Sequence, residues 1–92
     1  MSAPPIRVLV VDDQTVVREG LEMLLGLSPG IEVVAGAADG IEAVRLVDEL
    51  RPEVVLMDLR MPRLDGVEAT RQIIRAHPET RIVVLTTYAD DA

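Results

Sequence analysis

The sequence contains no cysteine, and this absence excludes two kinds of site. Without cysteine, the chain has neither a disulfide framework nor a thiolate-bound metal. Aromatic residues are almost as scarce, because Tyr88 is the only one in 92 residues. Hydrophobic residues nevertheless make up 49% of the chain. We therefore expect a core built from aliphatic side chains and methionine in a single small domain.

Positive charge is also scarce, and no lysine is present. The chain has 9 basic residues, all arginine, against 16 acidic ones, and its formal net charge is −7. This balance disfavours direct binding to nucleic acid, whose phosphates attract clusters of lysine and arginine. No apolar run approaches the ~18 residues of a membrane span, and residues 1–5 lack the pattern of a signal peptide. We expect a soluble, cytoplasmic domain without membrane contact.

The hydrophobic pattern alternates between strand-like and helix-like segments. Short apolar runs predict four strands, at residues 6–11, 31–38, 53–57 and 81–86. Apolar residues spaced three or four apart predict three intervening helices. Their expected inward-facing residues are Val17, Leu21, Leu24 and Leu25, then Ala43, Val44, Val47 and Leu50, and finally Val67, Thr70, Ile73 and Ile74. The order β-α-β-α-β-α-β favours an α/β fold, a doubly wound parallel sheet with helices on both faces.

Carboxylates follow two of the predicted strands. Asp12 and Asp13 come directly after the first strand, and Asp58 comes directly after the third. Ligands of parallel sheets bind at the carboxyl ends of the strands, so the three carboxylates share one crevice if these strands are neighbours. At ~4 Å and an effective dielectric near 20, each pair of like charges costs about 4 kcal/mol. A bound cation relieves that repulsion, and hard oxygen ligands suit Mg²⁺.

Structural interpretations compete with this one. Asp12 and Asp13 by themselves equally suit a cap for the first helix, and only Asp58 at the matching strand end favours the cation site. Asp65 is expected to cap the third helix rather than to bind metal. His77 is expected to be an exposed residue at the end of that helix.

Three segments of the chain resemble the receiver domains of bacterial two-component response regulators: VLVVDDQTVVREGL, VVLMDLRMPRLDGVEATRQI and RIVVLTTYADD. More narrowly, they look like receivers that precede a LuxR-type helix-turn-helix output domain. The resemblance covers residues 6–91 and implies a flavodoxin-like (CheY-like) sheet with strand order 2-1-3-4-5. It implies a phosphorelay protein that accepts a phosphoryl group from a sensor histidine kinase and is not an enzyme. Transcription would be regulated, and DNA contacted, only through an output domain outside this chain.

The resemblance also implies roles for individual residues. Asp58 matches the aspartate that accepts the phosphoryl group. Asp13 matches a direct Mg²⁺ ligand, and Asp12 matches its neighbour, which acts largely through a metal-bound water. Arg60 matches the position whose backbone carbonyl ligates the metal. Thr86 matches the hydroxyl that hydrogen-bonds the phosphoryl group and moves on activation.

Two features of the family pattern are absent from this sequence. The family uses a lysine at the end of a fifth strand, which pairs with the phosphoryl group, and an aromatic switch residue on that strand. We therefore expect residues 1–5 to form a disordered or extended tail and residues 6–92 to form a receiver truncated before the fifth strand and last helix. The uncovered strand, residues 82–85, is expected to pair with another chain, as a homodimer or by strand addition.

Two alternative functions remain open. A phosphatase of the haloacid-dehalogenase kind also uses a strand-end aspartate with Mg²⁺, but it needs a second aspartate two residues later, where this chain has Arg60. The other alternative is a receiver-like module that binds partners without phosphorylation. The missing lysine favours this module. The presence of all four site residues, Asp12, Asp13, Asp58 and Thr86, counts against it.

Overall fold

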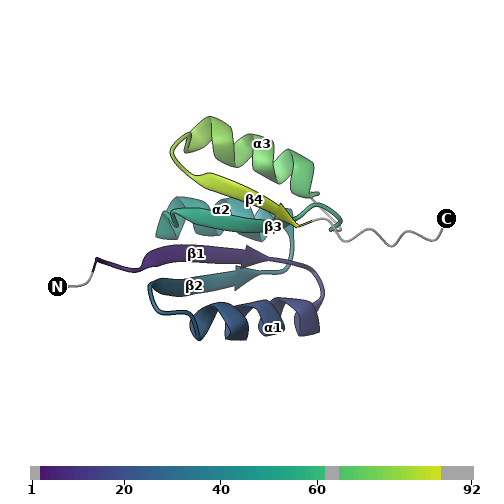
Figure 1. The fold of residues 1–92 in the computed structure, drawn as a ribbon. Helices are drawn as coiled ribbons and strands as arrows, with labels where there is room; N and C mark the ends of the chain where they lie inside the picture. Colours follow the sequence, from purple (N-terminus) through teal and green to yellow (C-terminus); the bar gives the residue numbers. More distant parts are fainter. Residues whose placement is uncertain (1–2, 62–64, 86–92) are drawn as a thin grey trace.

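The computed structural model describes residues 3–61 and 65–85. Strands and helices alternate along them: β1 (Ile6–Val11), α1 (Thr15–Gly26), β2 (Ile31–Ala37), α2 (Gly40–Leu50), β3 (Val54–Asp58), α3 (Gly66–Ala76) and β4 (Arg81–Leu85). This is the predicted order, and each described strand boundary lies within one residue of its prediction (Figure 1).

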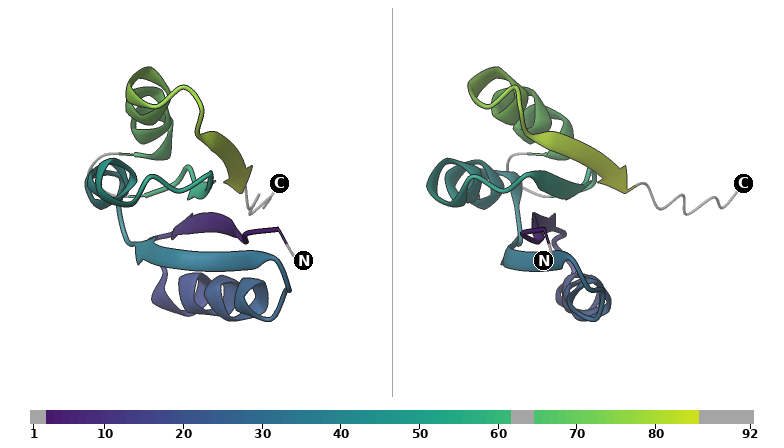
Figure 2. Two further views of the ribbon diagram at one scale, coloured as in Figure 1. Left: turned by 90° about the vertical axis from the view of Figure 1, so that its left-hand side faces the viewer. Right: turned by 60° about the vertical axis from the view of Figure 1, so that its left-hand side comes forward.

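The strands form one parallel sheet in the order β2-β1-β3-β4, as predicted. β1 lies between β2 and β3, and β4 pairs with β3 at the edge of the described sheet. α1 packs over β1 and β2 on one face, whereas α2 and α3 lie side by side on the other (Figure 2). Because all strands run the same way, their carboxyl ends meet at one edge of the sheet, where ligands of such folds bind.

The core is aliphatic, as the composition indicates, and it lies between the sheet and the pair α2 and α3. Its central side chains are at most 1% exposed, and they are Leu9, Val11, Ala37, Ala43, Val47, Val55, Met57, Ala69 and Ile73. β1 is buried on both faces from Val8 to Val11, which explains its unbroken run of apolar residues. This packing fixes the central strands, and it therefore also fixes the residues at their carboxyl ends.

The predicted inner face of α1 is correct at Leu21 and Leu25 and wrong at its other two positions. Val17 and Leu24 are 40% and 65% exposed. The partly buried positions of α1 are Arg18, Leu21, Glu22 and Leu25, which follow the spacing i, i+3, i+4, i+7. Two of these four positions are charged, so a search for apolar periodicity selects neighbouring leucine and valine instead.

The predicted inner face of α3 is also partly wrong. Val67 and Ile74 are 50% and 48% exposed, whereas Gly66, Ala69 and Ile73 are buried. α3 begins so close to β3 that a Cβ atom on Gly66 would collide with the backbone of the last residue of that strand. Small residues therefore face the sheet at the start of α3, and the larger apolar ones lie on its flank.

Candidate functional site

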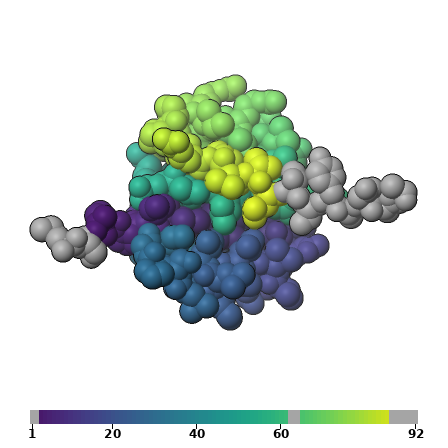
Figure 3. All heavy atoms as spheres, viewed as in Figure 1, coloured from purple at the N-terminus to yellow at the C-terminus, as the bar shows by residue number. Residues whose placement is uncertain are grey.

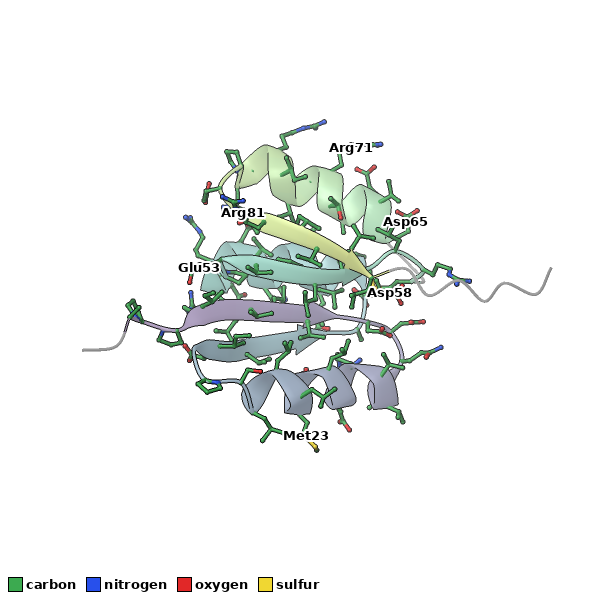
Figure 4. The ribbon with its side chains drawn as sticks, in the orientation of Figure 1. Met23, Glu53, Asp58, Asp65, Arg71 and Arg81 are labelled. Atoms are coloured by element: carbon green, nitrogen blue, oxygen red, sulfur yellow. The ribbon has the colours of Figure 1, made fainter. Side chains whose placement is uncertain are left out.

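Three carboxylates meet at the carboxyl edge of the sheet, as the strand-end positions predict. Asp58 is the last residue of β3, and Asp12 and Asp13 directly follow the neighbouring β1. One oxygen atom from each residue lies within 4.8 Å of the other two. In Figure 4, Asp58 lies at this edge, whereas Glu53 and Arg81 lie at the opposite one. A single cation can contact all three carboxylates at this spacing.

Asp12 is the most enclosed of the three carboxylates. It is 6% exposed, and its Oδ1 accepts a hydrogen bond from the backbone N–H of Gln14 at 2.9 Å. Burial raises the pKa of the Asp12 carboxyl above its usual 3.8, and the negative charges of Asp58 and Asp13 add to this effect. The Gln14 hydrogen bond and the guanidinium of Arg18 oppose it. Positive charge is therefore favoured beside this group.

Asp58 and Asp13 are more accessible than Asp12. Asp13 is exposed, and Asp58 is partly exposed. The Oδ1 atom of Asp58 accepts a hydrogen bond from the backbone N–H of Arg60 at 3.0 Å, so the turn after β3 orients this carboxylate. The bond also places the backbone of Arg60, the predicted carbonyl ligand, beside Asp58. Thr86, the predicted hydroxyl donor, lies outside the described residues.

The close approach of α3 to β3 supports the Asp58 end of the site. The N–H of Gly66 donates to the carbonyl of Leu59 at 3.2 Å. A side chain on Gly66 would collide with the carbonyl oxygen of Asp58 and would lie 2.5 Å from the Leu59 Cα atom. The neighbouring Asp65 caps α3, as predicted, because its Oδ1 accepts from the N–H of Glu68 at 2.8 Å. The Asp65 carboxylate thus bonds to the start of α3 and is not part of the carboxylate cluster.

The prediction of an exposed His77 is wrong. Its imidazole is buried, because the C-terminus of α3 packs against α2. Nε2 lies 2.6 Å from Oδ1 of Asp48 on α2, and Nδ1 lies 3.8 Å from a carboxylate oxygen of Glu79. His77 precedes β4, so it lies at the amino edge of the sheet, away from the three aspartates. It links two helices and has no place in the site.

Arg18 also supports the site, although the sequence analysis did not single it out. Its Nη1 donates to the backbone carbonyl of Asp12 at 2.8 Å. The available signal was its position three and seven residues before Leu21 and Leu25, which places an arginine on the inner face of α1.

A cavity of about 630 Å³ lies at the opposite edge of the sheet. Its lining includes Ile6, Val54, Val83, Arg51 and Arg81. The three aspartates lie at the other edge, so this cavity takes no part in their chemistry. In the described parts of the chain, no helix has the length and apolar character needed to cross a membrane.

Comparison with known proteins agrees with this geometry. The sequence model described as "Response regulator receiver domain" matches residues 8–92. The transcriptional regulatory protein LiaR of Bacillus subtilis is 52% identical over 86 residues, which are 94% of this chain and 41% of LiaR. The chain therefore spans about two fifths of the length of the curated relatives it matches.

Solved structures share both the fold and a substantial part of the sequence. The response regulator domain of Thermotoga maritima CheB has a TM-score of 0.87 and 40% identity, covering 96% of this chain and 65% of that one. A LuxR-family two-component response regulator from Aurantimonas has a TM-score of 0.86 and 44% identity, covering 91% of this chain and 60% of that one. The sheet order, the carboxylates at its edge and these similarities agree, and the chain belongs to the family of response regulator receiver domains.

Proposed function

We propose that Asp58 accepts a phosphoryl group from the phosphohistidine of a sensor histidine kinase. The observation that carries the proposal is the convergence of Asp12, Asp13 and Asp58 within 4.8 Å at the carboxyl edge of the sheet. Asp58 is the best placed of the three, because it is partly exposed and its carboxylate is oriented by the N–H of Arg60. Asp12 is too buried to meet a partner's side chain.

The transfer needs no general base at Asp58. An aspartate is ionised at neutral pH, so a carboxylate oxygen attacks phosphorus directly. The new O–P bond gives an acyl phosphate, while the P–N bond breaks and its electron pair stays on the imidazole of the kinase. The Arg60 N–H continues to hold the other oxygen of Asp58 during this step.

We further propose that Asp12, Asp13, Asp58 and the backbone carbonyl of Arg60 hold Mg²⁺. The donor set fits, because it consists of hard oxygens at short mutual distance with room for water on the exposed side of Asp13. The raised pKa of Asp12 also fits, because burial and the negative charges of Asp58 and Asp13 disfavour the Asp12 anion, which a cation would stabilise. When bound, Mg²⁺ would neutralise charge on the phosphoryl oxygens.

The remaining parts of the proposal concern the surrounding protein. Thr86 would donate a hydrogen bond to the phosphoryl group, and residues 6–92 would act as one receiver unit. Transcription and DNA contact would depend on an output domain outside this chain, in keeping with its similarity to LiaR and to a LuxR-family regulator. A cytoplasmic location follows from the proposed kinase partner.

We also propose that β4 pairs with a second chain. β4 is an edge strand of the described sheet, and its Val83 and Val84 are 46% and 44% exposed. In Figure 3, β4 lies at the surface of the face shown. Exposed apolar edges are templates for strand pairing. Sedimentation tests this, and a chain that remains monomeric at high micromolar concentration would refute it.

Phosphorylation is tested by incubating the 92-residue chain with acetyl phosphate and Mg²⁺ and measuring intact mass. We expect one added phosphoryl group, lost in Asp58→Asn and reduced in Asp13→Asn. Asp65→Asn is the matched control, because asparagine caps helices about as well as aspartate and this residue lies outside the cluster. Equal labelling of the Asp58→Asn variant would show that another residue is the acceptor.

A further inference from the structure

The turn that carries Asp12 and Asp13 leads into a helix without a side-chain cap. The side chain of Gln14, at the N-cap of α1, makes no capping hydrogen bond, and the first turn of α1 holds no acidic residue. α2 and α3 differ, because the side chains of Asp39 and Asp65 each accept a hydrogen bond from the backbone N–H three residues later. The segment that supplies two of the three carboxylates is therefore fixed in another way.

Arg18 ties the start of α1 to this turn through a different kind of bond. Its backbone N–H bonds to the carbonyl of Gln14 at 2.9 Å, as part of the first turn of α1. Its side chain reaches back across that turn, and Nη1 donates to the carbonyl of Asp12 at 2.8 Å. A single side chain thus joins the helix to the peptide group between Asp12 and Asp13.

The path of the Arg18 side chain depends on β2. Gly36 lies under its aliphatic stem, and a Cβ atom at Gly36 would be 3.1 Å from the Arg18 Cδ atom. Arg18 is partly buried in this position, on the inner face of α1. The stem thus passes between α1 and β2, and the guanidinium ends at the carbonyl of Asp12.

Asp12 is consequently held at three points. Its N–H donates to the carbonyl of Ala37 at 3.0 Å, its Oδ1 accepts from the N–H of Gln14, and its carbonyl accepts from Arg18. The first two bonds fix the end of β1 and the Asp12 carboxylate. The third fixes the peptide plane that leads into Asp13, and this plane sets the direction of the exposed Asp13 carboxylate.

We propose that Arg18 is a positioning residue for the cation site: its bond to the Asp12 carbonyl keeps the Asp13 and Asp12 carboxylates converged on Asp58. The inference rests on the proposed function, since it concerns the same Mg²⁺ site. Arg18 touches neither the cation nor the phosphoryl group. Its hydrogen bond acts through the backbone of Asp12.

The test measures Mg²⁺ binding to the purified 92-residue chain by calorimetric titration, with no phosphodonor present. Arg18→Gln should weaken Mg²⁺ affinity about tenfold, the lower end of the range for residues that orient metal ligands. Arg18→Lys keeps the charge, but its side chain ends one bond earlier, and it should weaken affinity at least about threefold. Arg45→Gln is the matched control, because it removes the same charge from an exposed ion pair with Glu49 on α2.

A role in stability alone would lower the melting temperature of the Mg²⁺-free chain while leaving the affinity of the folded molecules unchanged. Affinity within threefold of wild type for a folded Arg18 variant would therefore overturn the inference. If Arg18→Gln does not fold, Arg18→Lys decides by the same threshold. If the wild-type chain itself binds no Mg²⁺, it is the proposed cation site that fails, and the two failures are distinguishable.

Discussion

Neutralising Asp58 should make the protein more stable than wild type when no cation is present. When Mg²⁺ is present, the same variant should be less stable than wild type. Asp58→Asn removes one of three negative charges that lie within 4.8 Å of one another. The Oδ1 of asparagine can still accept the hydrogen bond from the N–H of Arg60, so the local turn is retained. The variant therefore isolates the effect of charge.

The magnitude follows from the spacing and the exposure of the cluster. One pair of charges at this separation repels by roughly 3 kcal/mol at an effective dielectric near 20. Solvent screens the exposed Asp13 and, in part, Asp58, so we expect about 1–2 kcal/mol of net relief. For a domain of this size, each kcal/mol corresponds to about 4–8 °C, so the variant should melt roughly 5–15 °C above wild type in EDTA.

Mg²⁺ should reverse this order. At a concentration of 100 times the dissociation constant, a bound ligand stabilises the wild type by about 2.7 kcal/mol. The variant lacks one ligand and should gain little. Thermal melting followed by circular dichroism, in EDTA and across a Mg²⁺ series, measures both effects. Glu32→Gln, at the start of β2 and hence at the opposite edge of the sheet, is the control for a change in net charge.

Two results would refute the reasoning. If Asp58→Asn melts at or below the wild-type temperature in EDTA, the carboxylates do not repel one another as their spacing requires. If Mg²⁺ raises the melting temperature of the variant as much as that of wild type, Asp58 is not a ligand. The control should behave as wild type in both conditions.

Three further predictions concern the supports of the site. Gly66→Ala should lower the free energy of unfolding by about 1–3 kcal/mol in urea titrations, because the new Cβ meets the rigid backbone of Asp58 and Leu59. Gly36→Ala, which meets only the side chains of Glu22 and Arg18, should cost less, and an equal loss would contradict this account. Asp39→Ala should cost about 1 kcal/mol by removing the cap on the Glu42 N–H, whereas Asp39→Asn should stay near wild type. Because burial raises the pKa of Asp12, the protonated carboxyl favours the folded state. This contribution to stability is complete below the pKa of Asp12 in the unfolded chain and is lost as pH rises through its pKa in the folded chain. In EDTA, Asp12→Asn should therefore gain stability over wild type between pH 4 and pH 7, and a constant difference across that range would contradict the raised pKa.

Local pattern in the sequence was sufficient for the strands and for placing the three aspartates at strand ends. A strand buried on both faces has to be apolar at successive positions, and β1 is so from Val8 to Val11. The alternation of strands and helices then requires parallel pairing, which brings Asp12, Asp13 and Asp58 to one edge. The cap at Asp65 was also predictable, because a capping hydrogen bond joins residues only three apart.

Tertiary contacts decided the features that the sequence pattern missed. Arg18 occupies an inner position of α1 because Gly36 on β2 leaves space for its stem, and no local pattern links residues 18 and 36. His77 is buried because Asp48, on a different helix, lies beside it.

The sequence by itself therefore determined the order of the elements, the aliphatic core and the edge at which the carboxylates gather, since each depends on residues close together in the chain. Only the tertiary structure decided which face of α1 and α3 turns inward and which side chain holds Asp12. Those choices depend on the distance of closest approach between elements, and that distance is set by the small residues, Gly36 and Gly66, at the points where the elements meet.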